Sequence, residues 1–384
     1  MKFETGKTQS YSRVCNNLLV IKHLQHKELS GTELSQRLSL SNATLSSILK
    51  QLLALGIIKV SESQKSDKEL GRKRVHYTLN DNFGLFLNVN ISNHQAHLSL
   101  ANLKEQILDK EVVDIEQYDA QAIYKIVLIA TQLLLRNEIK LIPLKCVVIS
   151  LPGRVNQETG ELLLSKQFDP NLFKEQDFIK NAFKNQFPGV PILISNDVNI
   201  ATQGEMRKGS LVGAENAIYI SIDQGIGGSL VINGKLFGGD YGYSGEFGLL
   251  KINYRGESGY LDDFVSLRVL RDEAEKITGE KVGRTRLIEL YNENQKIHEI
   301  VVKSGHFLGN GLKTIIEMLD INKIVLGGRC ILFGYEYLDA IKSELENLSS
   351  PVDVTFSFIN GDSKLIGATA MGVEYIISKE ISGE

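Results

Sequence analysis

The sequence predicts an α/β protein in which a small, basic, largely helical head precedes a larger body of mixed strands and helices. The chain has 384 residues, more than one hydrophobic core usually holds, so we expect two or three packed units. Residues 1–82 carry 13 Lys and Arg against 7 Asp and Glu, whereas the remainder carries 30 against 39. The resulting net charges, +6 and −9, indicate one domain over 1–82 and a second over 83–384.

The first part of the head has the pattern of three helices. Apolar residues recur at helical spacing over 12–24, and Ser30 or Thr32 can cap a second, short helix. A third helix is predicted over 42–55 and ends at Gly56, because glycine readily adopts the conformation that closes a helix. The last two helices are therefore joined by a tight turn.

Two short strands follow these helices and are joined by a charged segment. The strands are predicted over 57–63 and 75–80, and the stretch between them reads QKSDKELGRKR. Helix, short helix, turn, helix and hairpin is the order of a winged helix-turn-helix. The alternative is a small helical domain for protein contacts whose polar face is merely solvated. The excess positive charge and the Gly-Arg-rich segment favour DNA as the partner.

The third helix and the hairpin carry the side chains that DNA binding needs. A helix in the major groove presents short hydrogen-bonding groups to base edges, and Lys and Arg contact phosphates. Gly71 lets the hairpin backbone approach DNA, so that the guanidinium groups beside it can reach phosphate or a narrow minor groove. The predicted DNA-binding residues are Ser41, Asn42, Thr44, Ser46, Ser47, Lys50, Arg72, Lys73 and Arg74.

The body begins near Phe83 with a change to mixed strand and helix patterns. Asn233-Gly234 is a hairpin-turn signal, and several strands end in Gly or Asp, as strands that line a cleft commonly do. The predicted strands are 83–91, 97–103, 146–151, 191–197, 216–222, 227–232 and 323–328. The predicted helices are 120–137, 174–185, 198–208, 267–278 and 297–319.

The cysteines and the hydropathy of the chain indicate the cellular compartment of the protein. Cys15, Cys146 and Cys330 are far apart and form no CxxC pair, which argues against a disulfide framework and against a cysteine-based zinc site. The N-terminus lacks an apolar segment of signal-peptide length, and no stretch approaches eighteen apolar residues. We therefore expect a cytoplasmic protein that has no membrane partner.

Five segments of the body carry its most specific pattern. They are LPGRV (151–155), SNDVNIATQGE (195–205), DQGIGGS (223–229), GYSGEFG (242–248) and IVLGGR (324–329). Together they resemble the ROK family, whose name joins repressors, open reading frames and kinases. The resemblance extends over essentially the whole chain, because ROK repressors also carry an N-terminal winged helix, which ROK kinases lack.

The resemblance implies a two-lobed, actin-like sugar-kinase fold that binds sugar between its lobes. Asn196, Asp197 and Glu246 match the family's sugar ligands, and Asp262 stands where a further sugar-contacting Glu is usual. An amide or carboxylate at a strand end can engage two sugar hydroxyls at once. The competing interpretation makes Asp197 a helix cap and places Glu246 in a surface turn. The surrounding motif favours sugar contact.

The same resemblance argues against kinase activity. Active ROK kinases have an Asp-x-Gly-Gly-Thr turn for ATP phosphates, and the matching stretch contains Asn90, Ser92, Asn93 and His94. Side chains at those positions block the close approach of backbone amides to phosphate. Gln224 also replaces a small hydroxyl residue in the second phosphate turn. Asp197 matches the catalytic base, but a base without a phosphoryl donor transfers nothing, so we expect no catalytic residue and no cofactor.

A zinc site that many ROK proteins carry is also missing from the sequence. Leu249 stands at the position of its His, and no Cys occurs in the run over 253–260 that matches its Cys cluster. These side chains cannot form a tetrahedral Cys/His zinc site. We therefore expect no metal, and a loop that packing and hydrogen bonds hold in place, with Tyr260 as the candidate anchor.

These features predict a sugar-responsive transcription regulator, which is a repressor by family analogy. Its expected partners are a double-stranded DNA operator, a sugar or sugar phosphate that relieves repression, and further copies of the chain in a homodimer or homotetramer. Two alternatives remain open. One is an ATP-dependent sugar kinase with a degenerate phosphate site, and the other is a ligand-independent DNA-binding protein with a vestigial cleft.

Overall fold

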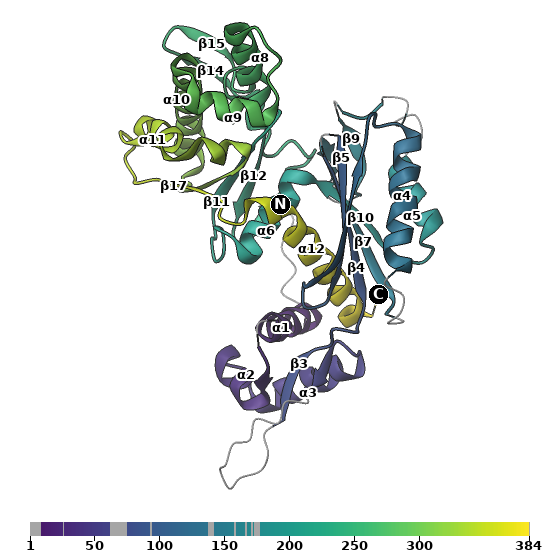
Figure 1. Cartoon of the computed structure of the whole chain (residues 1–384). Coiled ribbons are helices and arrows are strands. Elements are labelled where there is room, and N and C mark those ends of the chain that lie inside the picture. The colour runs from purple at the N-terminus through teal and green to yellow at the C-terminus, as the bar shows by residue number, and fades with distance from the viewer. Residues whose placement is uncertain are drawn as a thin grey trace. The chain divides into compact units, whose positions relative to one another are not determined.

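The chain forms two compact units (Figure 1). The computed structural model describes residues 9–25, 27–61, 75–92, 94–136, 142–156, 159–165, 167–169, 172 and 177–383. The first unit comprises residues 1–149, 168–193 and 369–384, and the second comprises 150–167 and 194–368. Within the described residues, every helix is too short or too polar to cross a membrane.

The N-terminal part of the first unit has the order of elements predicted for the head. Its elements are α1 (Gln9–Leu24), β1 (Leu29–Ser30), α2 (Gly31–Leu38), α3 (Asn42–Ala54), β2 (Ile58–Val60) and β3 (His76–Leu79). The strand order is β1-β3-β2, and β3 pairs antiparallel with both neighbours. This is the arrangement of a winged helix-turn-helix, with β2 and β3 as the wing. The boundary predicted at residue 82 stays a prediction.

Local side-chain signals set the ends of the two helices of the helix-turn-helix. Ser30, rather than Thr32, caps α2 in a reciprocal capping box with Glu33, whose carboxylate accepts from the Ser30 backbone amide at 2.7 Å. The turn that follows contains Ser39 in the left-handed region, at φ 51°. Ser41 then caps α3 by accepting a hydrogen bond from the Thr44 amide.

The first unit also contains a five-stranded sheet, with the order β10-β7-β4-β5-β6. The strands are β4 (Leu85–Ser92), β5 (Gln95–Asn102), β6 (Ile107–Asp114), β7 (Leu144–Leu151) and β10 (Ile192–Asn196). Figure 1 shows α4 (Ala120–Leu135) and α5 (Phe178–Gln186) on one face and α12 (Ser363–Ser382) on the other. Residues 174–176 of the predicted helix over 174–185 lie outside the described residues.

The second unit is built on another five-stranded sheet, with the order β13-β12-β11-β16-β17. Its strands are β11 (Ala217–Ile222), β12 (Ile226–Ile232), β13 (Lys235–Phe237), β16 (Lys323–Gly328) and β17 (Asp353–Phe356). Its helices are α6 (Asp197–Lys208), α7 (Asp262–Val265), α8 (Leu267–Thr278), α9 (Arg284–Glu293), α10 (Gln295–Leu319) and α11 (Gly334–Leu345). Short elements between them are β8 (Arg154–Val155), β9 (Leu162–Leu164), η3 (Phe247–Leu249), β14 (Lys251–Tyr254), β15 (Glu257–Tyr260), η4 (Arg329–Phe333) and η5 (Asn360–Asp362).

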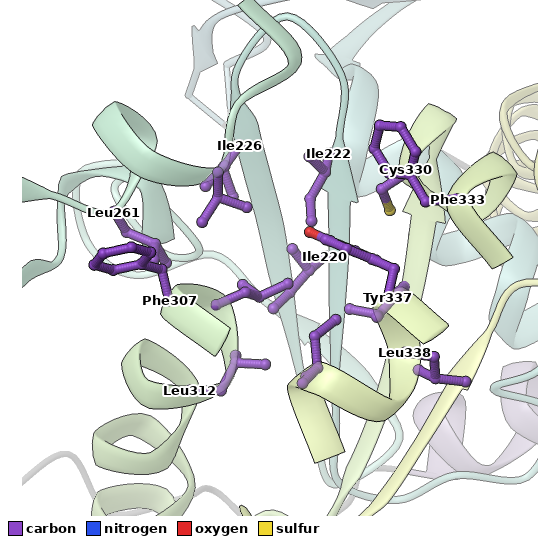
Figure 2. Close-up of a cluster of buried hydrophobic side chains, with 14 of the residues drawn as sticks. Ile220, Ile222, Ile226, Leu261, Phe307, Leu312, Cys330, Phe333, Tyr337 and Leu338 are labelled. Atoms are coloured by element: carbon purple, nitrogen blue, oxygen red, sulfur yellow. The ribbon is translucent and has the colours of Figure 1, made fainter. Parts of the chain in front are cut away.

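Alternation along β11 shows that both faces of this sheet are covered. Ile220 and Ile222 point into a large apolar cluster with residues of α10 and α11, including Phe307 and Leu338 (Figure 2). Tyr219 points to the opposite face, where it packs with residues of α6. Because successive side chains of a strand point to opposite faces, an apolar run such as AIYISI is what a strand buried on both sides requires.

The helices α6 and α12 cross at closely packed glycines. A Cβ at Gly204 would overlap the carbonyl oxygen of Ser363, and a Cβ at Gly367 would overlap that of Ile200. The two backbones can therefore approach each other only where a side chain is missing. This crossing positions the N-terminal turn of α12 beside α6, whose first turn carries the candidate site residues.

We predict that Gly367→Ala destabilises the protein even though it lies inside a helix. In an exposed helix, alanine is more favourable than glycine by about 1 kcal/mol. Here the added methyl group meets the backbone of α6, so we expect the free energy of unfolding to fall by roughly 2 kcal/mol. The shift of the urea denaturation midpoint measures it.

The matched control is Gly361→Ala, because a Cβ there has no atom within 4 Å. We expect this control to change the unfolding free energy by less than about 0.5 kcal/mol. A Gly367→Ala protein as stable as the wild type would contradict the close helix crossing.

Candidate functional site

A small polar pocket lies on the second unit, where four segments converge. They are the Gly153–Val155 turn and strand, the first residues of α6, the start of β12 and the loop over 242–246. The cavity has a volume of about 30 Å³. Asn196 and Glu246 both line it, so the structure brings together two of the predicted sugar ligands.

Glycines allow the backbone segments around the pocket to meet. Gly245 has φ of +86°, which non-glycine residues rarely adopt, and its Cβ would overlap the carbonyl oxygen of Gly228. A Cβ at Gly228 would in turn overlap the ring of Phe247. These glycines of the GIGG and GYSGE motifs are therefore required for the wall of the pocket, whatever ligand occupies it.

Asn196 is the residue that joins the segments. Its side-chain oxygen accepts hydrogen bonds from the amides of Val198 at 2.8 Å and Asn199 at 3.1 Å, and so caps α6. Its Nδ2 donates to the carbonyl oxygen of Gly153 at 2.6 Å. The sequence had suggested Asp197 as the alternative cap, but the structure assigns this role to Asn196.

Asp197 forms an ion pair instead. Its Oδ2 lies 2.6 Å from Nζ of Lys364, in the first turn of α12. The side chains are 18% and 27% exposed, so the pair is largely shielded from solvent. This contact holds the Asp197 carboxylate against α12, and Asp197 is not among the residues that line the pocket.

The remaining predicted carboxylate ligands differ in their surroundings. Glu246 is exposed at the end of the glycine-rich loop and is one of the residues that line the pocket. Asp262 accepts a hydrogen bond from the Ile226 amide at 3.1 Å and pairs with Arg268 at 3.2 Å. It therefore braces the start of β12, and it does not line the pocket around Asn196.

The turn that matches the family's second phosphate loop is filled by side chains. With its amide oxygen facing the guanidinium groups, Gln224 accepts from Arg284 Nε at 3.0 Å and from Arg271 Nη1 at 3.3 Å. Asp223 lies 3.9 Å from Nε of Arg329. A polar network of side chains thus occupies the turn between β11 and β12.

The segment that matches the first phosphate loop forms a tight hairpin in the first unit. Asn90 is paired with His97, and Ser92 with Gln95, in the antiparallel register of β4 and β5. His94 adopts φ of +63°, and the Ser92 carbonyl accepts a hydrogen bond from the Tyr118 hydroxyl. Asn93 lies outside the described residues.

The hairpin of β14 and β15, which corresponds to the family's zinc loop, is held by aromatic and polar contacts. The Tyr254 hydroxyl donates to Glu344, and the Tyr254 ring packs edge-on against Phe307 with centroids 5.4 Å apart. Tyr260, the anchor expected from the sequence, is 44% exposed, so Tyr254 holds the hairpin instead. The described residues contain no group of three His, Cys, Asp or Glu side chains that could hold a metal ion.

The outward face of α3 carries the predicted major-groove residues. Leu45, Ile48, Leu49 and Leu52 form its buried face. The hydroxyl of Ser41 caps the helix and hydrogen-bonds to that of Thr44 at 2.8 Å. The exposed polar residues are Ser41, Asn42, Thr44, Ser46, Ser47 and Lys50. The wing residues Arg72, Lys73 and Arg74 lie outside the described residues.

In the chain, a winged helix-turn-helix is followed by two five-stranded sheets with their helices. This order defines a protein with the actin-like sugar-kinase fold and an added N-terminal head. Residues 86–377 match the ROK family, and the chain belongs to this family. The resemblance noted in the five motifs is thereby confirmed.

The relatives among curated proteins include repressors of similar length. The chain is 22% identical to the xylose repressor of Caldicellulosiruptor bescii, over 94% of this chain and 96% of that protein. It is 27% identical to the xylose repressor of Staphylococcus xylosus, over 74% and 75%. It is 21% identical to the DNA-binding transcriptional dual regulator NagC of Escherichia coli, over 83% and 81%.

Solved structures show the same fold. A ROK family transcriptional regulator, a homolog of the Escherichia coli MLC protein, has a TM-score of 0.80 at 19% identity, over 97% of this chain and 98% of that chain. A ROK family glucokinase from Streptomyces griseus, in complex with glucose and AMPPNP, has a TM-score of 0.63 at 20% identity, over 75% and 99%.

Sequence reasoning missed two cations at the site. Lys364 is 167 residues from Asp197, and no local pattern connects them. Arg154 lies inside the LPGRV motif but was not singled out, although an arginine next to a pocket glycine was a visible signal.

We predict that Lys364→Met lowers the unfolding free energy by about 1–3 kcal/mol, because it leaves the carboxylate of Asp197 shielded from water and without its partner. Adding Asp197→Asn should recover part of this loss, since the amide carries no charge. Denaturant midpoints of the two single variants and of the double variant give the interaction energy between the side chains of Asp197 and Lys364.

Lys323→Met is the matched control, because the partner of Lys323, Asp353, is 57% exposed. We expect it to cost less than about 0.5 kcal/mol. Additive effects of Lys364→Met and Asp197→Asn would show that the ion pair contributes nothing.

Proposed function

We propose that the chain is a sugar-responsive transcriptional repressor. The observation that carries this proposal is the helix α3, whose apolar face is buried in a winged helix-turn-helix while its outward face is polar and exposed. The repressor names of relatives that align along most of the chain support it. In this proposal α3 and the wing bind double-stranded DNA, using the residues predicted from the sequence.

The small-molecule effector in this proposal is a sugar or sugar derivative, bound at the pocket of Asn196 and Glu246. Amide and carboxylate groups suit the directional hydrogen bonds of sugar hydroxyls. Asp197 and Asp262 would contact the sugar only if it displaced their present partners, Lys364 and Arg268. Sugar binding can weaken DNA binding only if the sugar has different affinities for the free and the DNA-bound arrangements of the protein.

The proposal excludes kinase activity for two reasons. The carboxylate that matches the catalytic base is bound to Lys364, and Gln224 with its arginine partners occupies the turn between β11 and β12 that would have to approach a phosphate. DNA binding by a repressor also favours a two-fold symmetric homodimer or a homotetramer, since a palindromic operator offers two equal half-sites.

The direct test has three measurements on the purified full chain. A duplex is first selected from random DNA by binding to the protein. Its dissociation constant is then measured by fluorescence anisotropy with and without each of a panel of monosaccharides and sugar phosphates. ATP hydrolysis coupled to sugar phosphorylation is measured in parallel. Absence of duplex binding at low salt, or turnover comparable with that of sugar kinases, would overturn the proposal.

We predict that Lys50→Ala weakens binding to specific and random duplexes alike and reduces the slope of log K against log salt by about 1, because one phosphate contact is lost. Lys235→Ala, an exposed charge change on β13, is the control and should leave the slope unchanged. An unaltered slope in Lys50→Ala would remove Lys50 from the DNA interface.

We predict that Glu246→Gln leaves the affinity for the selected duplex unchanged in the absence of sugar but weakens the response to sugar by about tenfold or more, since a charge-assisted hydrogen bond becomes a neutral one. The measurement is the sugar concentration that releases half of the bound duplex. If the half-release concentration does not change, Glu246 is not a sugar ligand.

A further inference from the structure

Two polar groups of the pocket have no hydrogen-bond partner in the described part of the chain. Arg154 Nε and Ser244 Oγ are shielded from solvent and make no hydrogen bond to another described residue. Both residues line the pocket of Asn196 and Glu246. Because buried polar atoms in native proteins are nearly always paired, two unpaired groups around one cavity indicate a ligand with hydrogen-bond acceptors.

The charge of Arg154 is a second observation at this pocket. Among the described residues, no carboxylate lies within ion-pair distance of its guanidinium group, unlike those of Arg268 and Arg286. Its contact is instead with an aromatic ring, since its Cζ lies 3.4 Å from the ring centroid of Tyr243. A guanidinium group that is stacked on tyrosine keeps its in-plane donors available for a planar or tetrahedral anion.

Arg154 connects the pocket to the ring of Tyr243. The guanidinium group stacks on the Tyr243 ring, and Arg154 also lines the pocket of Asn196 and Glu246. Tyr243 is 53% exposed, so its ring shields only one face of the guanidinium group. A ligand with an anionic group gives this guanidinium group a charged contact that a neutral sugar does not offer.

We propose that the pocket takes a sugar that carries an anionic oxygen group, a phosphate or a carboxylate, and that Arg154 selects this group. The inference rests on the proposed sugar site and specifies its ligand class. Arg154 and Ser244 donate to the anionic group, whereas the carboxylate of Glu246 would repel it and binds the ring hydroxyls instead. A phosphorylated sugar and a sugar acid share this chemistry.

The test compares matched ligands by isothermal titration calorimetry, which needs no DNA. The neutral probes are glucose, N-acetylglucosamine and xylose. The anionic probes are glucose 6-phosphate, glucuronate, N-acetylglucosamine 6-phosphate and xylonate, and inorganic phosphate is added as a probe without a sugar. We expect at least one anionic form to bind about tenfold or more tighter than its neutral counterpart at low salt, and this advantage to shrink as salt rises. The affinities of the sugar phosphates and of the sugar acids, compared with each other, show which of the two anionic groups the pocket prefers.

Two variants assign the preference to Arg154. Arg154→Met keeps the length of the side chain and removes its charge, and we expect the anionic preference to fall below about threefold. Arg154→Lys keeps the charge and should retain an intermediate preference. Thermal unfolding and duplex affinity without ligand serve as controls, because Arg154 lies outside the winged helix-turn-helix.

The outcomes separate this inference from the proposed function. Tighter binding of a neutral sugar, an unchanged preference in Arg154→Met, or inorganic phosphate binding as tightly as any sugar phosphate would overturn the anionic-sugar assignment. Release of the duplex by a neutral sugar would do so as well, while leaving the repressor proposal intact. If Arg154→Met fails to fold, the wild-type preference and Arg154→Lys decide the question.

Discussion

The geometry of the candidate site depends on one side chain, that of Asn196. Its amide joins the Gly153 carbonyl to the free backbone amides at the start of α6, so three hydrogen bonds hold a turn and a helix end together. Unpaired helix-end amides are costly to bury, and a side-chain cap satisfies them while it determines where the helix begins. Because the helix begins there, Asp197 faces α12 and the pocket opens beside Gly153.

The pairing of Asp197 with Lys364 connects the first turn of α6 to the first turn of α12. The glycines at the crossing of α6 and α12 bring the two helices into backbone contact, and Lys364 lies one turn before Gly367 on α12. The ion pair therefore follows from the packing of these two helices. Gln224 is likewise held by residues distant in the sequence, because its amide oxygen accepts hydrogen bonds from Arg271 and Arg284.

Much of the fold was predictable because its signals are local. The capping residues Ser30 and Ser41, the alternation in β11, and the strand-end glycines each depend on a few neighbouring residues. The helix over 267–278 was predicted with the bounds that the structure has. Elements with weaker patterns were missed, including β6, whose burial alternates between half-buried and exposed, and the short β17. Half-buried edge strands carry little apolar signal, so their sequences resemble loops.

The sequence by itself determined the order of the elements, the family, and the side chains available for chemistry, because motifs and periodicities are properties of neighbouring residues. Only the tertiary structure decided which of these side chains meet. It made Asn196 the cap, paired Asp197 with Lys364, placed Arg154 on Tyr243, and anchored the hairpin of β14 and β15 through Tyr254 and Glu344. Partners tens to hundreds of residues apart come together through the packing of sheets and helices, and no local spacing in a single sequence records that packing.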